Sequence, residues 1–181
     1  MNVEACVQKK VVRIFLIVII IGAFSNVFSQ NTKNDWSSFQ FLLGEWQGVG
    51  SGKPGEAVGS SIFSFDLQNT ILIRKSYADY PAANNRPAFQ HDDLMIIYQE
   101  NKAIKAIYFD NEGHTINYLV NLSQNLNTII FVSDINSAAP RFRLTYIKTG
   151  ENTMKISFEF APPGKPEEFS KYLDGVLKKK I

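Results

Sequence analysis

Cysteine is almost absent from this sequence, in which Cys6 is the only one among 181 residues. A single thiol provides neither a disulfide framework nor a set of thiolate zinc ligands. Cys6 also precedes an apolar run near the N-terminus instead of following it, so it is badly placed for lipid modification. We therefore expect no structural disulfide and no cysteine nucleophile in the folded protein.

Catalytic motifs and a strong excess of one charge are missing as well. The chain contains no G-x-S-x-G, phosphate-binding loop or H-E-x-x-H sequence, and its only histidines are His91 and His114. The formal net charge is +2, and no basic stripe runs through the sequence. A nucleic-acid partner is therefore not expected. The closing "LKKK" is too short to indicate binding of nucleic acid or lipid headgroups.

The N-terminal apolar run "IFLIVIIIGAF" is short, because a membrane-spanning helix needs about 20 apolar residues. It follows Lys9, Lys10 and Arg13 and precedes small residues, which is typical of a secretory signal peptide. We predict cleavage after Ser29 and a secreted or periplasmic protein without membrane attachment; an uncleaved anchor is the alternative. Residues 1–29 hold three of the 19 basic and one of the 17 acidic residues, so their removal leaves 16 of each.

Aromatic residues, in contrast, are plentiful. The chain has 14 Phe and 7 Tyr, and such flat side chains pack well on the pleated surface of a sheet. Its hydrophobic content of 45% is ordinary for a globular protein with a core. The length suits one domain, which we place at residues 30–181.

Strand-like segments separated by short turns fill this domain. The expected strands are 45–52, 58–67, 70–79, 92–99, 103–110, 114–122, 127–134, 141–149 and 153–162, followed by a closing segment near the C-terminus. The one long loop is expected at 80–90. Nine or ten evenly spaced strands indicate an all-β antiparallel meander, and closing it into a barrel removes exposed sheet edges. A barrel of this size can keep a central cavity for one small ligand.

The first strand carries an unusual pattern, "FQFLLGEWQGVGSG". Trp46 and every second residue from Gly48 to Gly52 share one face, because side chains alternate along a strand. Glycine within a strand marks a bend or the close approach of another backbone or a ligand. We predict that Trp46 plugs one end of the barrel. The preceding "SSFQFLLG" is expected to form a short helical cap, with Ser37 or Ser38 as its N-cap.

This pattern, Phe41-Leu42-Leu43-Gly44-x-Trp46-x-Gly48-x-Gly50-x-Gly52, resembles the opening motif of the nitrobindin-like haem-binding β-barrels. The tail "KYLDGVLKKK" is similar to that family's closing "xHLxAxxKK" strand. The resemblance covers both ends of the chain. It implies a ten-stranded barrel related to the lipocalins and the fatty-acid-binding proteins.

The tail departs from the family at one functional position. The resemblance implies that the histidine of the closing motif binds haem iron, and Tyr172 stands at the matching position here. Tyrosinate can ligate ferric haem, but it needs a nearby cation such as Lys171 or Arg143 to lower its pKa. Haem binding through Tyr172 therefore stays an alternative. A barrel with a different cargo and no cofactor is the favoured expectation.

Two polar clusters are candidates for chemistry. His91 and Asp93 share one face of their strand while Asp92 faces the other way, and Glu112 or His114 would have to join from a neighbouring turn. A histidine beside carboxylates serves as a general base in many enzymes, which suggests hydrolase- or isomerase-type chemistry at the barrel mouth. The alternative is a polar strand entrance that only ties down the loop 80–90.

Arginines on later strands are candidates for binding an acidic ligand group. A buried arginine needs a carboxylate or a ligand anion, which makes Arg74, Arg143 and the nearby Tyr118 possible ligand contacts. An exposed salt bridge is the alternative for Arg143, with Glu159 expected near Arg141.

The favoured hypothesis is a lipocalin-like barrel that binds a small apolar or amphipathic molecule in an aromatic cavity of a few hundred Å³. The candidate ligand contacts are Trp46, Arg74, His91, His114, Tyr118, Arg143 and Tyr172. The alternatives are the enzyme, the haem-binding barrel, and a filled barrel that acts through its surface. Phe158 or Phe160 on an outer face would favour a homodimer.

Overall fold

The computed structural model describes residues 35–50, 58–83 and 86–181. The predicted leader, residues 1–29, and Gly52 lie outside the described residues. The elements are the 3₁₀ helix η1 (Ser37–Leu42) and the strands β1 (Gly44–Val49), β2 (Val58–Asp66), β3 (Ile71–Tyr80), β4 (Phe89–Glu100), β5 (Ala103–Asp110), β6 (Thr115–Leu122), β7 (Thr128–Ser133), β8 (Arg141–Lys148), β9 (Thr153–Ala161) and β10 (Ser170–Lys179). Among these residues, no helix is long and apolar enough to cross a membrane.

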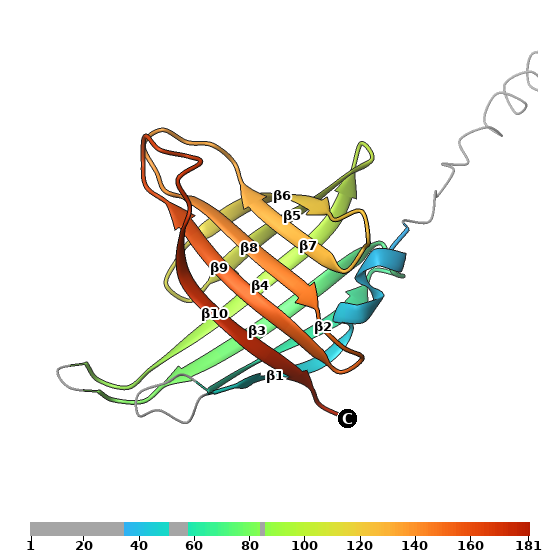
Figure 1. Cartoon of the computed structure of the whole chain (residues 1–181), viewed down its shortest axis with the longest axis horizontal. Coiled ribbons are helices and arrows are strands. Elements are labelled where there is room, and N and C mark those ends of the chain that lie inside the picture. Colours follow the sequence, from blue (N-terminus) through green and yellow to red (C-terminus); the bar gives the residue numbers. More distant parts are fainter. Residues whose placement is uncertain (1–34, 51–57, 84–85) are drawn as a thin grey trace, which may run out of the picture. The chain divides into compact units, whose positions relative to one another are not determined.

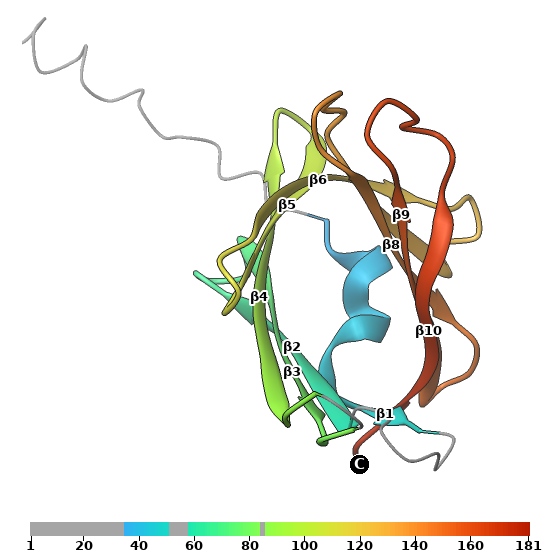
Figure 2. The same ribbon diagram turned by 90° about the vertical axis from the view of Figure 1, so that its left-hand side faces the viewer.

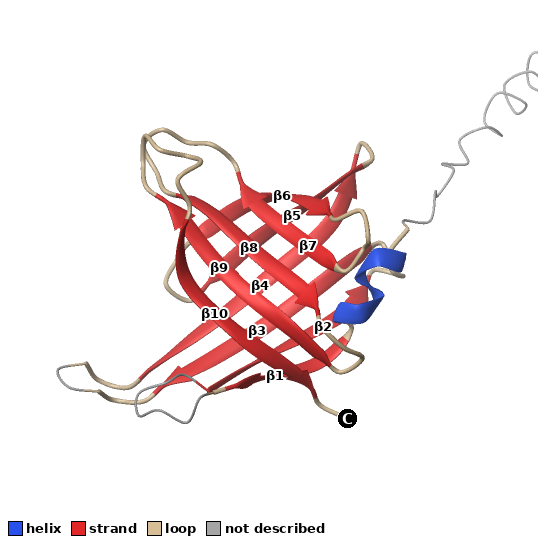
Figure 3. Ribbon diagram, viewed as in Figure 1, coloured by secondary structure: helices blue, strands red, loops and turns tan. Residues whose placement is uncertain are grey.

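The ten strands form one closed antiparallel barrel, as the even spacing of the predicted strands indicated (Figures 1 and 3). Each strand pairs with its neighbours in sequence, and β1 pairs with β10 to close the ring, with Trp46 opposite Lys179. The predicted loop at 80–90 is shorter than expected, because β3 continues to Tyr80 and β4 begins at Phe89. These two residues pair, so the hairpin extends the sheet into the expected loop.

The helix η1 covers one end of the barrel. Figure 2 shows the strands surrounding η1 in the view turned by 90°. Its Phe39 and Leu42 are completely buried, and Trp36 just before it donates its indole N–H to the carbonyl of Asn69 in the β2–β3 turn. The cap was therefore predicted correctly, but its N-cap was not. Trp36 occupies the N-cap position, and the backbone N–H of Ser37 is bound by the Asp35 carboxylate instead of a serine hydroxyl.

Trp46 lies directly above this cap. Its side chain is 1% exposed, and its indole N–H donates to the carbonyl of Leu42 over 2.6 Å. The predicted plug is thus confirmed, with the hydrogen bond fixing the ring against η1. At Gly48 a Cβ would lie 3.4 Å from the carbonyl oxygen of Gly59, so the absence of a side chain lets two backbones approach here.

Inward-pointing side chains fill the middle of the barrel. The largest of the fully buried ones besides Trp46 are Tyr146, Phe39, Phe63, Phe131, Leu42, Leu72, Met95, Ile97, Ile129 and Met154. Edge-to-face contacts of Tyr146 with Phe63 and Phe131 join the two sides of this core. The inner space next to η1 is therefore packed with side chains.

Candidate functional site

The end of the barrel opposite η1 differs from the packed middle in its exposure. Ile116, Phe142 and Phe158 point inward by strand alternation, yet each keeps part of its surface accessible, as does Tyr108. The loops β3–β4, β5–β6, β7–β8 and β9–β10 all lie at this end. We call this region the barrel mouth, and its inward-facing residues form the candidate site.

Arg74 forms the floor of the mouth on the β3 side. Its guanidinium donates from Nη1 to the hydroxyl of Tyr146 over 2.7 Å and from Nη2 to the carboxylate of Asp93 over 2.5 Å. The side chains of Arg74 and Asp93 are only 5% and 10% exposed. The remaining guanidinium nitrogen, Nε, is buried and has no hydrogen-bond partner among the described residues. An unpaired buried donor is costly, so it marks a place where one more acceptor would stabilise the structure.

Electrostatics keep this arginine charged. Burial by itself lowers the pKa of Arg74, but Tyr146 and Asp93 offset the penalty, and the pKa ends above its ordinary value. Burial raises the pKa of Tyr146, and the guanidinium opposes that rise. Tyr146 is therefore a neutral hydrogen-bond acceptor for Arg74. Asp93 is the countercharge that makes a buried guanidinium tolerable.

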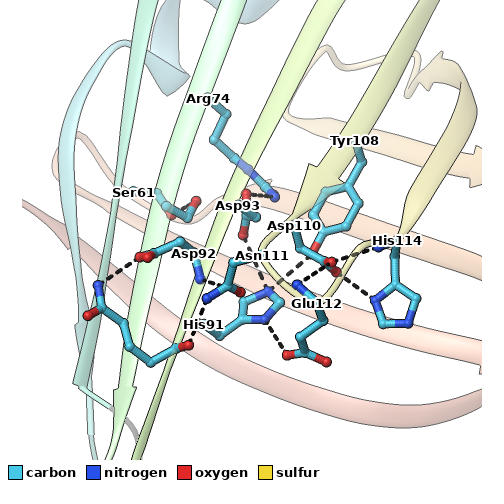
Figure 4. A network of polar contacts seen from close by, with 12 residues as sticks. Ser61, Arg74, His91, Asp92, Asp93, Tyr108, Asp110, Asn111, Glu112 and His114 are labelled. Carbon is cyan, nitrogen blue, oxygen red and sulfur yellow. Dashed lines mark hydrogen bonds and ion pairs between the residues drawn. The ribbon is translucent and has the colours of Figure 1, made fainter.

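A second part of the network runs from Asp93 to the rim, as Figure 4 shows. Nε2 of His91 lies 3.9 Å from Asp93 Oδ2 and 3.1 Å from the hydroxyl of Tyr108, while Nδ1 lies 2.9 Å from Glu112. The Tyr108 hydroxyl donates to Asp110, whose carboxylate also lies 2.9 Å from Nδ1 of His114. A continuous set of polar contacts therefore connects the buried arginine with the exposed β5–β6 turn.

In this second part of the network, Tyr108 and Asp110 have shifted pKa values. Burial, together with Asp93 and Asp110, raises the pKa of Tyr108, which therefore stays a neutral phenol. Burial would raise the pKa of Asp110, but hydrogen bonds from the backbone and side chain of His114 and from Tyr108 reverse the effect and lower it. Asp110 is thus a stable carboxylate.

An aromatic surface lies across the mouth from this polar network. The rings of Phe142 and Phe158 stack with centroids 5.8 Å apart, and Tyr172 packs edge-on against Phe158 and Phe160. These residues belong to β8, β9 and β10, whereas the polar network belongs to β3, β4 and β5. In a ring of ten strands, β4 and β9 are five positions apart in both directions. The mouth therefore has one polar wall and one aromatic wall.

The structure brings together some of the predicted residues. Arg74 and His91 both contact Asp93, and Tyr118 is close enough for the charge of Arg74 to oppose the rise that burial causes in the pKa of Tyr118. His114 lies at the rim of the same wall and reaches it through Asp110. Trp46 lies deeper, in the packed core.

Arg143 does not belong to this group. Arg143 lies on the outward face of β8. Its guanidinium donates two hydrogen bonds, of 2.7 and 2.8 Å, to the carboxylate of Glu159 and lies over the ring of Phe169. The expected pairing of Glu159 with Arg141 is wrong, since β8 and β9 place Arg143 opposite Glu159 and Arg141 opposite Ala161. The backbone N–H of Thr149 donates to the carbonyl of Thr153 at the β8–β9 turn. From this turn the pairing of β8 with β9 continues without a register shift.

Phe158 and Phe160 also differ from the expectation of an outer aromatic face. Both rings contact Tyr172, and Phe158 stacks on Phe142, which packs against the core from the inner side. They therefore line the mouth, so the condition stated for a homodimer, an outer face that carries Phe158 or Phe160, is not met. The reason is that residues of even number point inward on β9, as the burial of Met154 shows. The homodimer itself stays a prediction.

Several residues of the site were not found from the sequence. Tyr146 and Tyr108 are single tyrosines within alternating strands, and nothing in the pattern marks them as partners of Arg74 and His91. Asp110 was expected only as the end of the strand 103–110, although it accepts hydrogen bonds from the backbones of Glu112 and His114. An aspartate four residues before a histidine at a hairpin is the one signal that could have pointed to it.

Two of the hollows among the described residues lie at the tips of β3 and β4 and along β2 to β5, and neither of these two is the central aromatic cavity that we expected. One, of about 500 Å³, lies at the tips of β3 and β4 against Tyr80 and Phe89, which stack at 4.4 Å. The other, of about 460 Å³, lies along β2 to β5 and includes Ile62, Tyr77 and Phe109.

Metal and haem ligation find little support in these residues. Within the described ranges, no group of three or more His, Cys, Asp or Glu side chains is arranged to hold a metal ion. Tyr172 is 72% exposed, and the two cations that could assist it are bound elsewhere, Lys171 to Asp174 and Arg143 to Glu159. His91 and His114 stand on the other wall, each against a carboxylate. The residues present do not fit an axial haem ligand.

Comparison with known proteins supports the fold. No protein-family model and no curated protein matches the chain. Among solved structures, the crystal structure of Rv2717c from M. tuberculosis is similar, with a TM-score of 0.58 and 15% sequence identity over 81% of this chain and 97% of that one. At this identity the likeness concerns the barrel fold alone.

Proposed function

We propose that the protein is a binding protein for a small apolar or amphipathic molecule, which it holds in the barrel mouth. The observation that carries this proposal is the division of the mouth into an aromatic wall and a polar wall, both partly accessible. Phe142 and Phe158 would bury the apolar part of the ligand. Arg74, through its unpaired Nε, and the groups around Asp93 would receive the polar part.

The physical chemistry of such a site is simple. Apolar surface removed from water contributes about 25 cal/mol per Å², so a ligand that covers two phenylalanine rings gains a few kcal/mol from that wall. Polar groups that are already oriented lose little entropy on binding. The hydrogen bonds among Arg74, Asp93 and Tyr146 orient the polar wall before any ligand arrives.

The proposal places the protein among nitrobindin-like and lipocalin-like barrels and in a secreted or periplasmic location. The motif around Trp46 and the leader-like residues 1–29 support this assignment. Mass spectrometry of the protein isolated from its own host tests the location. A chain that begins at Gln30 is expected, and a chain that retains residues 1–29 would indicate a membrane anchor instead.

Enzymatic acid–base chemistry is less well supported. His91 and Asp93 do converge, but both ring nitrogens of His91 are already engaged, one with Glu112 and one with Tyr108. A general base needs a free lone pair aimed at its substrate. The arrangement suits a rigid polar wall better than proton transfer.

Titration with the neutral fluorescent probe N-phenyl-1-naphthylamine tests the binding proposal. The probe is expected to bind and to raise the melting temperature, because a ligand that binds only the folded state stabilises it. Phe158→Ala is expected to weaken binding about tenfold through lost apolar contact. Phe109→Ala, which removes an exposed ring, is the control and should leave binding unchanged. A loss confined to Phe109→Ala would move the site to the hollow along β2 to β5.

A further inference from the structure

From the charges of the polar wall we infer that the mouth selects ligands whose polar end is uncharged or cationic, and that it disfavours carboxylates. This inference rests on the proposed binding function and names the class of ligand. It differs from the expectation that an arginine in such a barrel serves to hold an acidic group.

The hydrogen bonds of Arg74 leave little of its guanidinium free for a ligand. A guanidinium recognises a carboxylate strongly when it offers two parallel N–H donors. In this site Nη1 donates to Tyr146 and Nη2 donates to Asp93, which leaves Nε as the one guanidinium nitrogen without a hydrogen-bond partner among the described residues. One N–H suits a single acceptor such as a hydroxyl or carbonyl oxygen. A paired contact with a carboxylate would need a second N–H from Nη1 or Nη2, and these nitrogens already donate to Tyr146 and Asp93.

The charge around the arginine also disfavours a ligand carboxylate. The polar wall holds one guanidinium, that of Arg74, and three carboxylates, those of Asp93, Asp110 and Glu112. Its formal charge is therefore −2 with both imidazoles neutral and zero with both protonated. In neither state is the wall positive, so a ligand carboxylate would meet repulsion that a hydroxyl or an ammonium group avoids.

The other described cations at this end of the barrel are engaged with groups other than the ligand site. Arg141 and Arg143 bind Glu167 and Glu159, and Lys171 binds Asp174. Arg86 lies farther out, over the rings of Tyr80 and Phe89 at the β3–β4 tip. Lys165 in the β9–β10 loop binds Glu168. Within the described parts of the chain, these positions give an anionic headgroup no counterpart next to Arg74.

Displacement of N-phenyl-1-naphthylamine by three ligands with the same twelve-carbon tail tests the inference. Dodecanol, dodecylamine and laurate are compared below their micelle concentrations at pH 7.5 and low salt. Laurate is expected to bind at least about tenfold more weakly than the other two. Laurate binding as tightly as dodecanol would overturn the inference and leave the binding function intact. Failure of the probe and of all three ligands would overturn the binding function itself.

Two variants connect the preference with the polar wall. Glu112→Gln removes one negative charge at the partly exposed rim and is expected to improve laurate binding relative to dodecanol severalfold. Asp92→Asn makes the same charge change one residue from Asp93, but on the outer face, where Asp92 accepts a hydrogen bond from Gln90. It should leave the ranking unchanged. Equal shifts in both variants would show that overall charge and not the wall sets the preference, and would overturn the inference.

Discussion

Nη2 of Arg74 and Oδ1 of Asp93 lie 2.5 Å apart in the interior of the barrel, where both side chains are almost completely buried. Arg74 itself pairs with Met95 across the β3–β4 ladder, and Asp93 pairs with Ser76, so the two charges meet diagonally on the inner face. This ion pair, with Tyr146 on the other guanidinium nitrogen, separates the packed core from the open mouth. Its burial makes it sensitive to the loss of either partner.

Arg74→Met is expected to destabilise the protein by about 3–5 kcal/mol, because it leaves the Asp93 carboxylate buried without a countercharge. The double variant Arg74→Met/Asp93→Leu should recover most of the loss, since it removes both charges. Urea denaturation measures both values. For comparison, Arg143→Met removes a partly exposed ion pair and should cost no more than about 1 kcal/mol. A double variant less stable than Arg74→Met would contradict this account.

Trp46→Phe is expected to cost about 2–3 kcal/mol, because it removes buried volume and leaves the carbonyl of Leu42 without its indole donor. Trp36→Phe is the matched change at the other tryptophan at the η1 end of the barrel. Its acceptor, the carbonyl of Asn69, lies in an exposed turn where water can replace the donor, so the loss should be smaller. Equal losses in the two variants would argue against a special role for the Trp46 hydrogen bond.

Gly59→Ala should destabilise the barrel by about 1–3 kcal/mol, because its Cβ would lie 2.6 Å from the carbonyl oxygen of Tyr77 on the neighbouring strand. Gly48→Ala places its Cβ 3.4 Å from the carbonyl oxygen of Gly59, a distance that needs only a small shift. We therefore expect a cost below about 1 kcal/mol at Gly48. Thermal melting of the two variants gives the comparison, and a larger loss at Gly48 would be inconsistent with the backbone geometry.

The lowered pKa of Asp110 predicts how the free energy of unfolding changes in acid. Its pKa is lower in the folded protein than its ordinary value of 3.8, so the carboxylate contributes stability above that value. This contribution disappears as the pH falls through the folded pKa, because protonation removes the acceptor of the His114 and Tyr108 hydrogen bonds. The free energy of unfolding should fall more steeply below about pH 4 in the natural protein than in Asp110→Asn. Identical slopes in urea denaturation series would refute this role.

Much of the fold was predictable from the chain because strand alternation is a local property. Phe142, Leu144 and Tyr146 alternate with polar residues, and each inward or outward assignment on β8 follows from that alone. The same property shows why the expectation for Phe158 failed: the even positions of β9 already include the buried Met154. The N-cap of η1 was missed because no side chain caps this helix: Trp36 stands at the N-cap position, and the backbone N–H of Ser37 donates to the Asp35 carboxylate.

The sequence by itself determined one β domain, the order of its strands, the cap and the tryptophan that plugs one end, since each follows from periodicity, turn residues and the size of one side chain. Only the tertiary structure decided the site. Arg74 and Tyr146 are 72 residues apart and come from strands on different sides of the barrel, and their contact depends on how the sheet closes. Closure also sets the aromatic wall of β8, β9 and β10 across from the polar wall of β3, β4 and β5. Strand alternation predicts whether a side chain points inward. Which other side chain it contacts across the interior depends on the pairing of all ten strands.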